Sequence, residues 1–135
     1  MLCGAAPLVE QIVDDPAAGE GEVVVEIRCA GICHSDAHYR ADASRVRLPV
    51  TLGHEIAGVI AGTSRRVALH YLMPNGDMLG KERDGGYAER IVVPAANAIA
   101  IPDAMPFEQA AINGVLDELV SGTAHVRTVV SLSRA

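Results

Sequence analysis

The chain has 135 residues, half of them apolar but only 3% aromatic, and its formal net charge is −6. This length is that of one domain, which can bury a core of Val, Ile, Leu and Ala without disulfides. The 11 Lys and Arg residues are scattered and are outnumbered by 17 Asp and Glu residues. A nucleic-acid-binding surface needs clustered basic residues, so we expect no nucleic acid among the partners.

The sequence also gives no sign of a membrane-bound or secreted protein. The first residues, MLCGAAPLVEQ, lack the basic flank and long apolar stretch of a signal peptide. No apolar run approaches the roughly 18 residues of a spanning helix. The cysteines Cys3, Cys29 and Cys33 are an odd number, which does not fit a disulfide framework. We expect no membrane partner, a cytoplasmic location, and thiols that are reduced or bind a metal, with Cys3 packed near the terminus.

In chain order, the sequence predicts mainly β-structure. Runs rich in β-branched residues predict strands over residues 22–33, 65–72, 88–94 and 98–102. Seven Pro and 13 Gly residues spread between these runs predict many turns, as in a closed or sandwiched β-architecture. Residues 105–122 differ, because their apolar residues follow a helical spacing and a glycine stands where the helix would end.

The stretch GICHSDAH at residues 31–38 and the GHE at residues 53–55 gather side chains that can carry chemistry. Thiolate and imidazole are preferred zinc ligands, and a catalytic zinc has about three protein ligands plus an open position. Cys33, His54 and Glu55 could supply that set. The alternative is a buried thiol and a core histidine that bind nothing. Cys33 and His54 are 21 positions apart, so a zinc site would require the fold to bring two loops together.

Ser35 and His38 follow Cys33 by two and five positions. Beside a metal, their hydroxyl and imidazole could carry a proton from a bound alcohol to solvent. Without a metal, the same residues would form a polar loop. Asp36 is better explained as an anchor of this loop, accepting backbone or imidazole hydrogen bonds, than as a catalytic acid.

Four segments, in this order, resemble the catalytic domain of zinc-dependent medium-chain alcohol dehydrogenases. They are GICHSDAH, LPVTLGHEIAG at residues 48–58, RRVALH at 65–70 and DGGYAERIVVP at 84–94. The combination of GICxSD with GHExxG is specific, although a motif needs its structural context. The resemblance implies a mainly β fold, a GroES-like β-barrel with a few short helices, as a single domain over residues 1–135. It does not imply chaperone function.

The resemblance also implies roles for individual residues. Cys33 and His54 would bind one catalytic Zn²⁺, and Glu55 would be an adjacent carboxylate that can approach or exchange onto the metal. Ser35 would take the proton of the substrate hydroxyl, and His38 would pass it on. The substrate of an intact family member would be a small alcohol or carbonyl compound, and its second cofactor would be NAD(P).

Three passages of the family pattern are missing from this sequence. A lobe of four cysteines that holds a structural zinc would fall near residues 74–80, where Asn75-Gly76 predicts a tight turn instead. A longer passage is shortened near 62–65. At 112–114 the family's nucleotide-binding domain is missing, and the family's remaining zinc ligand is missing with it. The chain contains no GxGxxG motif. These junctions favour an engineered minimal catalytic domain without a cofactor site of its own.

The remaining candidates have simpler explanations. Cys29 is interpreted as a buried strand thiol and His125 as a surface residue. His70, at the end of RRVALH, could approach the zinc site with Glu82 or Asp84 as neighbours, although an ordinary surface role is favoured.

Three classes of function remain open. The first is a zinc-binding catalytic domain derived from an NAD(P)-dependent alcohol dehydrogenase. The second is a hydrolase-like enzyme that acts through zinc-bound water at an open site. The third is a non-enzymatic scaffold that forms a homo-oligomer through the exposed former domain interface. Metal content separates the third class from the other two, and hydrolysis of an activated ester without nicotinamide separates the second from the first.

Overall fold

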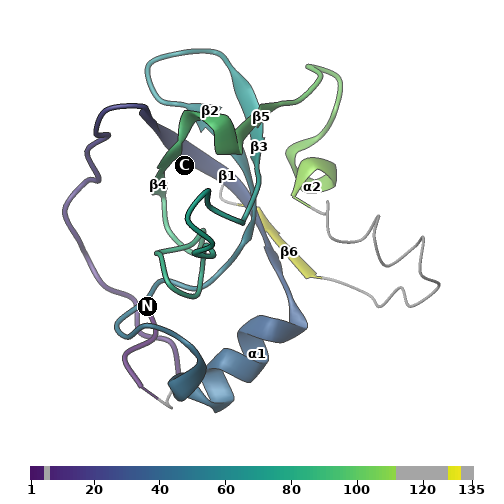
Figure 1. The fold of residues 1–135 in the computed structure, drawn as a ribbon. Coiled ribbons are helices and arrows are strands. Elements are labelled where there is room, and N and C mark those ends of the chain that lie inside the picture. Colours follow the sequence, from purple (N-terminus) through teal and green to yellow (C-terminus); the bar gives the residue numbers. More distant parts are fainter. Residues whose placement is uncertain (5–6, 112–127, 132–135) are drawn as a thin grey trace.

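In the computed structural model, which describes residues 1–4, 7–111 and 128–131, the chain folds around one curled antiparallel sheet (Figure 1). The sheet has the strand order β4-β1-β2-β3-β5, and β6 also pairs with β1. The described elements are β1 (Glu22–Ile32), α1 (His34–Ala41), the 3₁₀ turn η1 (Ala43–Arg45), β2 (Glu55–Ile60), β3 (Arg66–Leu69), β4 (Arg90–Pro94), η2 (Ala95–Asn97), β5 (Ala98–Ala100), α2 (Phe107–Ala110) and β6 (Thr128–Ser131).

Strand β1 is the centre of this sheet. Its first half pairs with β4 and its last four residues with β6, while its other edge pairs with β2. The register with β2 shifts between Ile27 and Cys29, which is the signature of a β-bulge. Beyond the bulge, Gly31 lies opposite Glu55. The end of β1 therefore meets the beginning of β2.

The core follows from the alternation of side chains along the strands. In β1, Val25, Ile27 and Cys29 are at most 3% exposed, whereas the charged side chains between them are partly exposed. The main cluster of buried side chains consists of Val25, Ile27, Ile56, Ile60, Val67, Leu69, Met73, Leu79, Ile91 and Val93. The prediction of an aliphatic core is confirmed.

The mainly β fold class predicted from the sequence is confirmed, and four predicted strands are present as β1, β3, β4 and β5. Strand β2 was not predicted, because five of its six residues are buried and it shows no alternation. Helix α1 was not predicted from the sequence, because it offers no apolar stripe. Of the helix predicted over 105–122, residues 107–110 form α2, whereas residues 105, 106 and 111 are described but not helical. Residues 112–122 of that prediction, and His125, lie outside the described residues.

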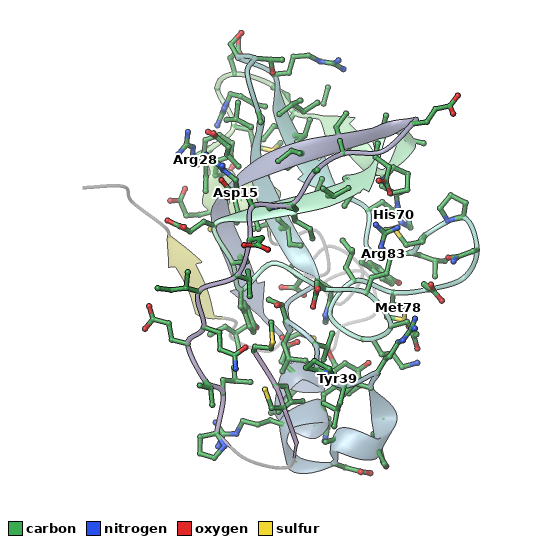
Figure 2. The ribbon with its side chains drawn as sticks, turned by 90° about the vertical axis from the view of Figure 1, so that its left-hand side faces the viewer. Asp15, Arg28, Tyr39, His70, Met78 and Arg83 are labelled. Atoms are coloured by element: carbon green, nitrogen blue, oxygen red, sulfur yellow. The ribbon has the colours of Figure 1, made fainter. Side chains whose placement is uncertain are left out.

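The segment before β1 runs across the sheet without forming a strand. A salt bridge connects this segment to β4, since the carboxylate of Asp15 lies 2.6 Å from the guanidinium of Arg90. Figure 2 labels Asp15 on this segment. Ile12 is fully exposed, and Cys3 is exposed. The prediction that Cys3 is packed is wrong; its neighbour Leu2, at 0% exposure, is the buried residue of this terminus.

The predicted tight turn at Asn75-Gly76 is present. The backbone N–H of Gly76 donates to the carbonyl oxygen of Met73 at 2.9 Å, and Gly76 has a φ of +90°. Whether this turn replaces a cysteine lobe stays a prediction. No helix within the described ranges is long and apolar enough to cross a membrane.

Leu79 and Leu72 provide a matched test of the core. Leu79 is 1% exposed and Leu72 is 44% exposed. Leu79→Ala should lower the free energy of unfolding by about 2 to 5 kcal/mol, because it leaves a cavity, and Leu72→Ala should cost clearly less. Denaturant unfolding of both variants measures the difference, and equal losses would contradict this description of the core.

Candidate metal centre

The antiparallel pairing of β1 with β2 brings together the two motifs that the sequence separates. Cys33 directly follows β1 and is the N-cap residue of α1, while His54 and Glu55 lie at the beginning of β2. One potential ligand atom from each of these three residues lies within 4.8 Å of the other two. Cys33 is partly buried, the side chain of His54 is 12% exposed and Glu55 is 7% exposed. The site thus offers sulfur, nitrogen and oxygen donors, which fits Zn²⁺.

At two positions in the motifs, the structure explains why the residue is glycine. A Cβ atom at Gly31 would overlap the carboxylate of Glu55 on the neighbouring strand. Gly53, which precedes His54, has a φ of +97°, and a Cβ atom there would lie 2.8 Å from the ring of Tyr87. The absence of a side chain at these two positions allows the loops to approach each other.

Asp36 anchors the loop that carries Cys33. Its Oδ2 accepts a hydrogen bond from the backbone N–H of Cys33 at 2.9 Å and one from the hydroxyl of Tyr87 at 2.7 Å. Asp36 is only 5% exposed, so these bonds lie in a weakly solvated environment. The interpretation of Asp36 as an anchor that accepts a backbone hydrogen bond is confirmed.

A second loop, residues 84–87, supports the first residues of the GHE motif. The backbone N–H groups of Gly85, Gly86 and Tyr87 donate to carbonyl oxygens of Thr51, Gly53 and Leu52 at 2.7 to 3.0 Å. The carboxylate of Asp84 accepts from the N–H of Thr51 at 2.8 Å. The DGGY sequence is therefore the part of the chain that holds the loop before His54 and brings Tyr87 to Asp36.

The imidazole of His54 has an acidic and an aromatic neighbour. Its Nδ1 lies 3.8 Å from Oδ1 of Asp36, which is too long for a hydrogen bond, and among the described residues neither atom has a hydrogen-bond partner. The ring of Tyr71 meets the His54 ring at 64°, with centroids 5.9 Å apart. Because Nδ1 faces Asp36, Nε2 is the ring nitrogen that remains for a metal.

The surroundings of the three cysteines differ in their effect on the thiol. Hydrogen bonding with His54 lowers the pKa of Cys33 to about 6, against the opposing effect of burial. Burial, with the charge of Glu108 as a smaller cause, raises the pKa of Cys29 to about 11. The thiolate is the form that binds metals, so Cys33 is prepared for coordination near neutral pH. Cys29 is 0% exposed, which confirms its interpretation as a buried strand thiol.

The structure places the two predicted proton carriers differently. Ser35 lies two residues from Cys33 and is half-buried, and its buried hydroxyl oxygen has no hydrogen-bond partner within the described part of the chain. His38 is exposed on α1, where its ring stacks on that of His34 with centroids 6.2 Å apart. The proton route from Ser35 to His38 stays a prediction.

His70 has other neighbours than the two suggested by the sequence. Its ring stacks on Tyr71, with centroids 5.4 Å apart and an interplanar angle of 10°. Glu82 instead pairs with Lys81 at 2.8 Å, and Asp84 holds Thr51. His70 is thus connected to His54 through the ring of Tyr71 and not through a carboxylate.

Sequence reasoning missed both tyrosines of this site, Tyr71 and Tyr87. Only 3% of the chain is aromatic. The rarity of aromatic residues was therefore a signal for both positions, since Tyr87 lies inside DGGY and Tyr71 directly follows RRVALH. Each tyrosine contacts a residue of the two motifs, Asp36 or His54.

A pocket of about 580 Å³ lies between the segment of residues 8–16 and residues 86–90. Cys33, His54 and Glu55 do not line it, whereas Tyr87 does. This pocket therefore adjoins the anchor of the Cys33 loop and not the three potential ligands.

Residues 19–103 match the family model described as alcohol dehydrogenase GroES-like domain. The starvation-sensing protein RspB of Escherichia coli K12 is 36% identical over 124 residues, covering 73% of this chain and 36% of that protein. The L-threonine 3-dehydrogenase of Symbiobacterium thermophilum is 31% identical over 139 residues, covering 82% of this chain and 40% of that enzyme.

A similar solved structure is the cobalt- and zinc-bound thermostable alcohol dehydrogenase from Pyrobaculum aerophilum. It has a TM-score of 0.66 and 27% identity, over 76% of this chain and 39% of that one. The chain therefore spans about two fifths of the length of the proteins that it resembles.

The thiol environments predict selective alkylation of the metal-free protein. Iodoacetamide should modify Cys33 with a midpoint near pH 6 and should leave Cys29 unmodified at pH 7, because the two pKa values are about 6 and about 11. Since folding lowers the pKa of Cys33 from the usual thiol value of 9.0, the stabilising contribution of its thiolate is fully present above pH 9.0 and is lost as the pH falls through about 6.

Mass spectrometry of peptides from timed reactions between pH 5 and 9 measures both thiols. His54→Ala should move the Cys33 midpoint upward, because the largest cause of the lowered pKa is removed. A wild-type midpoint near 9, or equal modification of both cysteines, would disagree with the geometry.

Proposed function

This chain belongs to the family of the alcohol dehydrogenase GroES-like domain, and we propose that it is the zinc-binding catalytic domain of an alcohol dehydrogenase. The observation that carries the proposal is the convergence of Cys33, His54 and Glu55, with ligand atoms within 4.8 Å of one another. The lowered pKa of Cys33 supports it, because a thiolate is the better ligand.

In this proposal, Cys33 and His54 are the permanent ligands of a single Zn²⁺. Glu55 is the neighbouring carboxylate that approaches the metal, and it starts β2 directly beside Gly31. When bound, zinc polarises the oxygen of an alcohol or carbonyl compound and lowers the pKa of a bound hydroxyl. Ser35, half-buried beside Cys33, then receives the hydroxyl proton, and the exposed His38 exchanges it with solvent.

Hydride transfer needs NAD(P), which we assign to the intact parent enzyme and to no residue of this chain. The chain spans only about two fifths of its relatives. The absent GxGxxG motif and the junctions near 62–65, 74–80 and 112–114 are consistent with an excised catalytic domain. Its engineered origin and its single-domain character stay predictions.

A hydrolase-like activity is the second candidate, and the exposure of the site favours it. The side chain of His54 is 12% exposed and Cys33 is half-buried, so solvent reaches the proposed ligands. Zinc held by Cys33 and His54 would supply hydrolytic chemistry toward activated esters, because a bound metal lowers the pKa of water. Self-association as a scaffold stays the third prediction, and the exposed Ile12 and Val13 offer apolar surface for it.

The proposed centre predicts one zinc per chain. Protein refolded with excess zinc and then freed of unbound metal should contain one equivalent, and Cys33→Ala and His54→Ala should each lose most of it, because each removes a ligand. Elemental analysis measures the content, and Cys29→Ala is the matched control because Cys29 is buried in the strand. Zinc retained by Cys33→Ala would contradict the ligand assignment.

The proposal assigns zinc binding to this chain and NAD(P) binding to the rest of the parent enzyme, which predicts the activity of the isolated chain. It should show no saturable oxidation of alcohols with NAD or NADP, because positioning of the hydride acceptor, worth about 7 to 11 kcal/mol, comes from elsewhere in the parent. Zinc-dependent hydrolysis of an activated ester should be detectable and should disappear in His54→Ala. Saturable NAD-dependent turnover, with contaminating full-length enzyme removed, would contradict the proposal.

A further inference from the structure

We propose that His34 and His38, four positions apart on α1, form a second metal site, which binds a divalent transition-metal ion of the Ni²⁺, Cu²⁺ and Zn²⁺ class. This histidine pair shares no ligand with the centre at Cys33, so the proposal does not depend on the function proposed above. It rests on the spacing of the two residues, the distance between their rings, their exposure and the orientation of their helix.

The spacing of the histidine pair is that of two ligands on one helix. Helix α1 (His34–Ala41) lies below the sheet in Figure 1, and both histidines belong to its regular part. Side chains four positions apart lie on one face of an α-helix, with Cβ atoms about 5 to 6 Å apart. Two imidazoles at this spacing can bind the same ion, because each contributes one ring nitrogen.

The two rings are near enough to share an ion. Their centroids are 6.2 Å apart and their planes are inclined by 29°. Bonds from zinc to imidazole nitrogen are about 2.0 to 2.1 Å long, so the ion would lie between the rings. Both residues are exposed, and exposed side chains change rotamers rapidly. Side-chain rotation alone can therefore bring one nitrogen of each ring to a common ion, with no change in the helix backbone.

The anchor of α1 turns the histidine pair toward solvent. Asp36 lies two positions from each histidine, which places it about 200° around the helix axis from one and 160° from the other. It is 5% exposed, and its carboxylate accepts a hydrogen bond from the hydroxyl of Tyr87 at 2.7 Å. At the other end, the N–H of Asp42 donates to the carbonyl oxygen of His38 at 2.8 Å. The pair therefore projects from a helix whose orientation is already fixed.

The donor atoms determine which ions the histidine pair accepts. Imidazole nitrogen suits Ni²⁺, Cu²⁺ and Zn²⁺, whereas Mg²⁺ prefers oxygen ligands. The net charge of −6 favours the approach of any cation. With only two protein ligands, the pair should hold its ion more weakly than the centre at Cys33. Its ion should be lost when unbound metal is removed, which agrees with one retained zinc per chain.

Nickel titration of the chain tests the histidine pair. Calorimetry in excess Mg²⁺ should show Ni²⁺ binding that is weakened roughly tenfold or more in His34→Ala and in His38→Ala, because one imidazole lacks the gain from a second ligand on the same chain. His70→Ala is the matched control, since His70 is also exposed but lies outside α1. It should bind Ni²⁺ as the wild type does.

A spacing variant separates a shared ion from two independent surface histidines. His38→Ala combined with Arg40→His keeps the number of histidines on α1, but position 40 lies about 240° around the axis from His34. This variant should bind Ni²⁺ as weakly as His38→Ala alone. Circular dichroism of each variant checks that the fold is unchanged.

A second background separates the histidine pair from the centre at Cys33. In His54→Ala, the further change His38→Ala should weaken Ni²⁺ binding by the same factor as in the wild type. If it has no effect there, the ion belongs to the centre at Cys33 and the proposal is wrong. If the wild type retains no zinc but the pair variants still lose Ni²⁺ affinity, the proposed function fails and the second site stands.

Three other results would overturn the proposal. The first is equal Ni²⁺ affinity in the wild type and in His38→Ala. The second is wild-type affinity in the spacing variant, because the ion would then need no common helix face. The third is an equal loss in His70→Ala, which would show that any exposed histidine contributes.

Discussion

The candidate centre depends on the antiparallel pairing of β1 with β2, which places Gly31 opposite Glu55. This register brings Cys33, just after one strand, to His54 and Glu55 at the start of the other. A shift by one residue would turn Glu55 to the opposite face of the sheet and separate the donors. The bulge between Ile27 and Cys29 is part of this register, because it changes which residues of the two strands face each other.

The pairing alone would leave the two loops free to move, and the buried carboxylate of Asp36 restrains them. Asp36 joins the backbone of Cys33 to the hydroxyl of Tyr87, and the loop of Tyr87 is bonded to residues 51–53 just before His54. One carboxylate thus connects the motif after β1, the motif before β2 and the DGGY segment. The other oxygen of Asp36, Oδ1, lies 3.8 Å from Nδ1 of His54, so the same carboxylate also faces the imidazole.

Residue types and local motifs predicted much of the site. Cys33, His54 and Glu55 were proposed because thiolate, imidazole and carboxylate are the donors that zinc prefers, and these three residues are indeed clustered. Their roles as ligands, and those of Ser35 and His38 as proton carriers, stay predictions. Tyr71 was missed because it lies in no motif that has chemistry of its own, and it becomes relevant only through its distance to His54.

The sequence by itself determined the mainly β class, the aliphatic core and the donor residues, because β-propensity and donor chemistry are properties of single residues and short runs. Only the tertiary structure decided the position of β2, whose residues are mostly buried without alternation, and the helical state of α1, whose Asp36 accepts hydrogen bonds from Cys33 and Tyr87 through Oδ2. It also decided the row of His70, Tyr71 and His54. The contacts of Tyr87 with Asp36 and of Tyr71 with His54 join residues distant in the chain, and no local pattern encodes the distance between them.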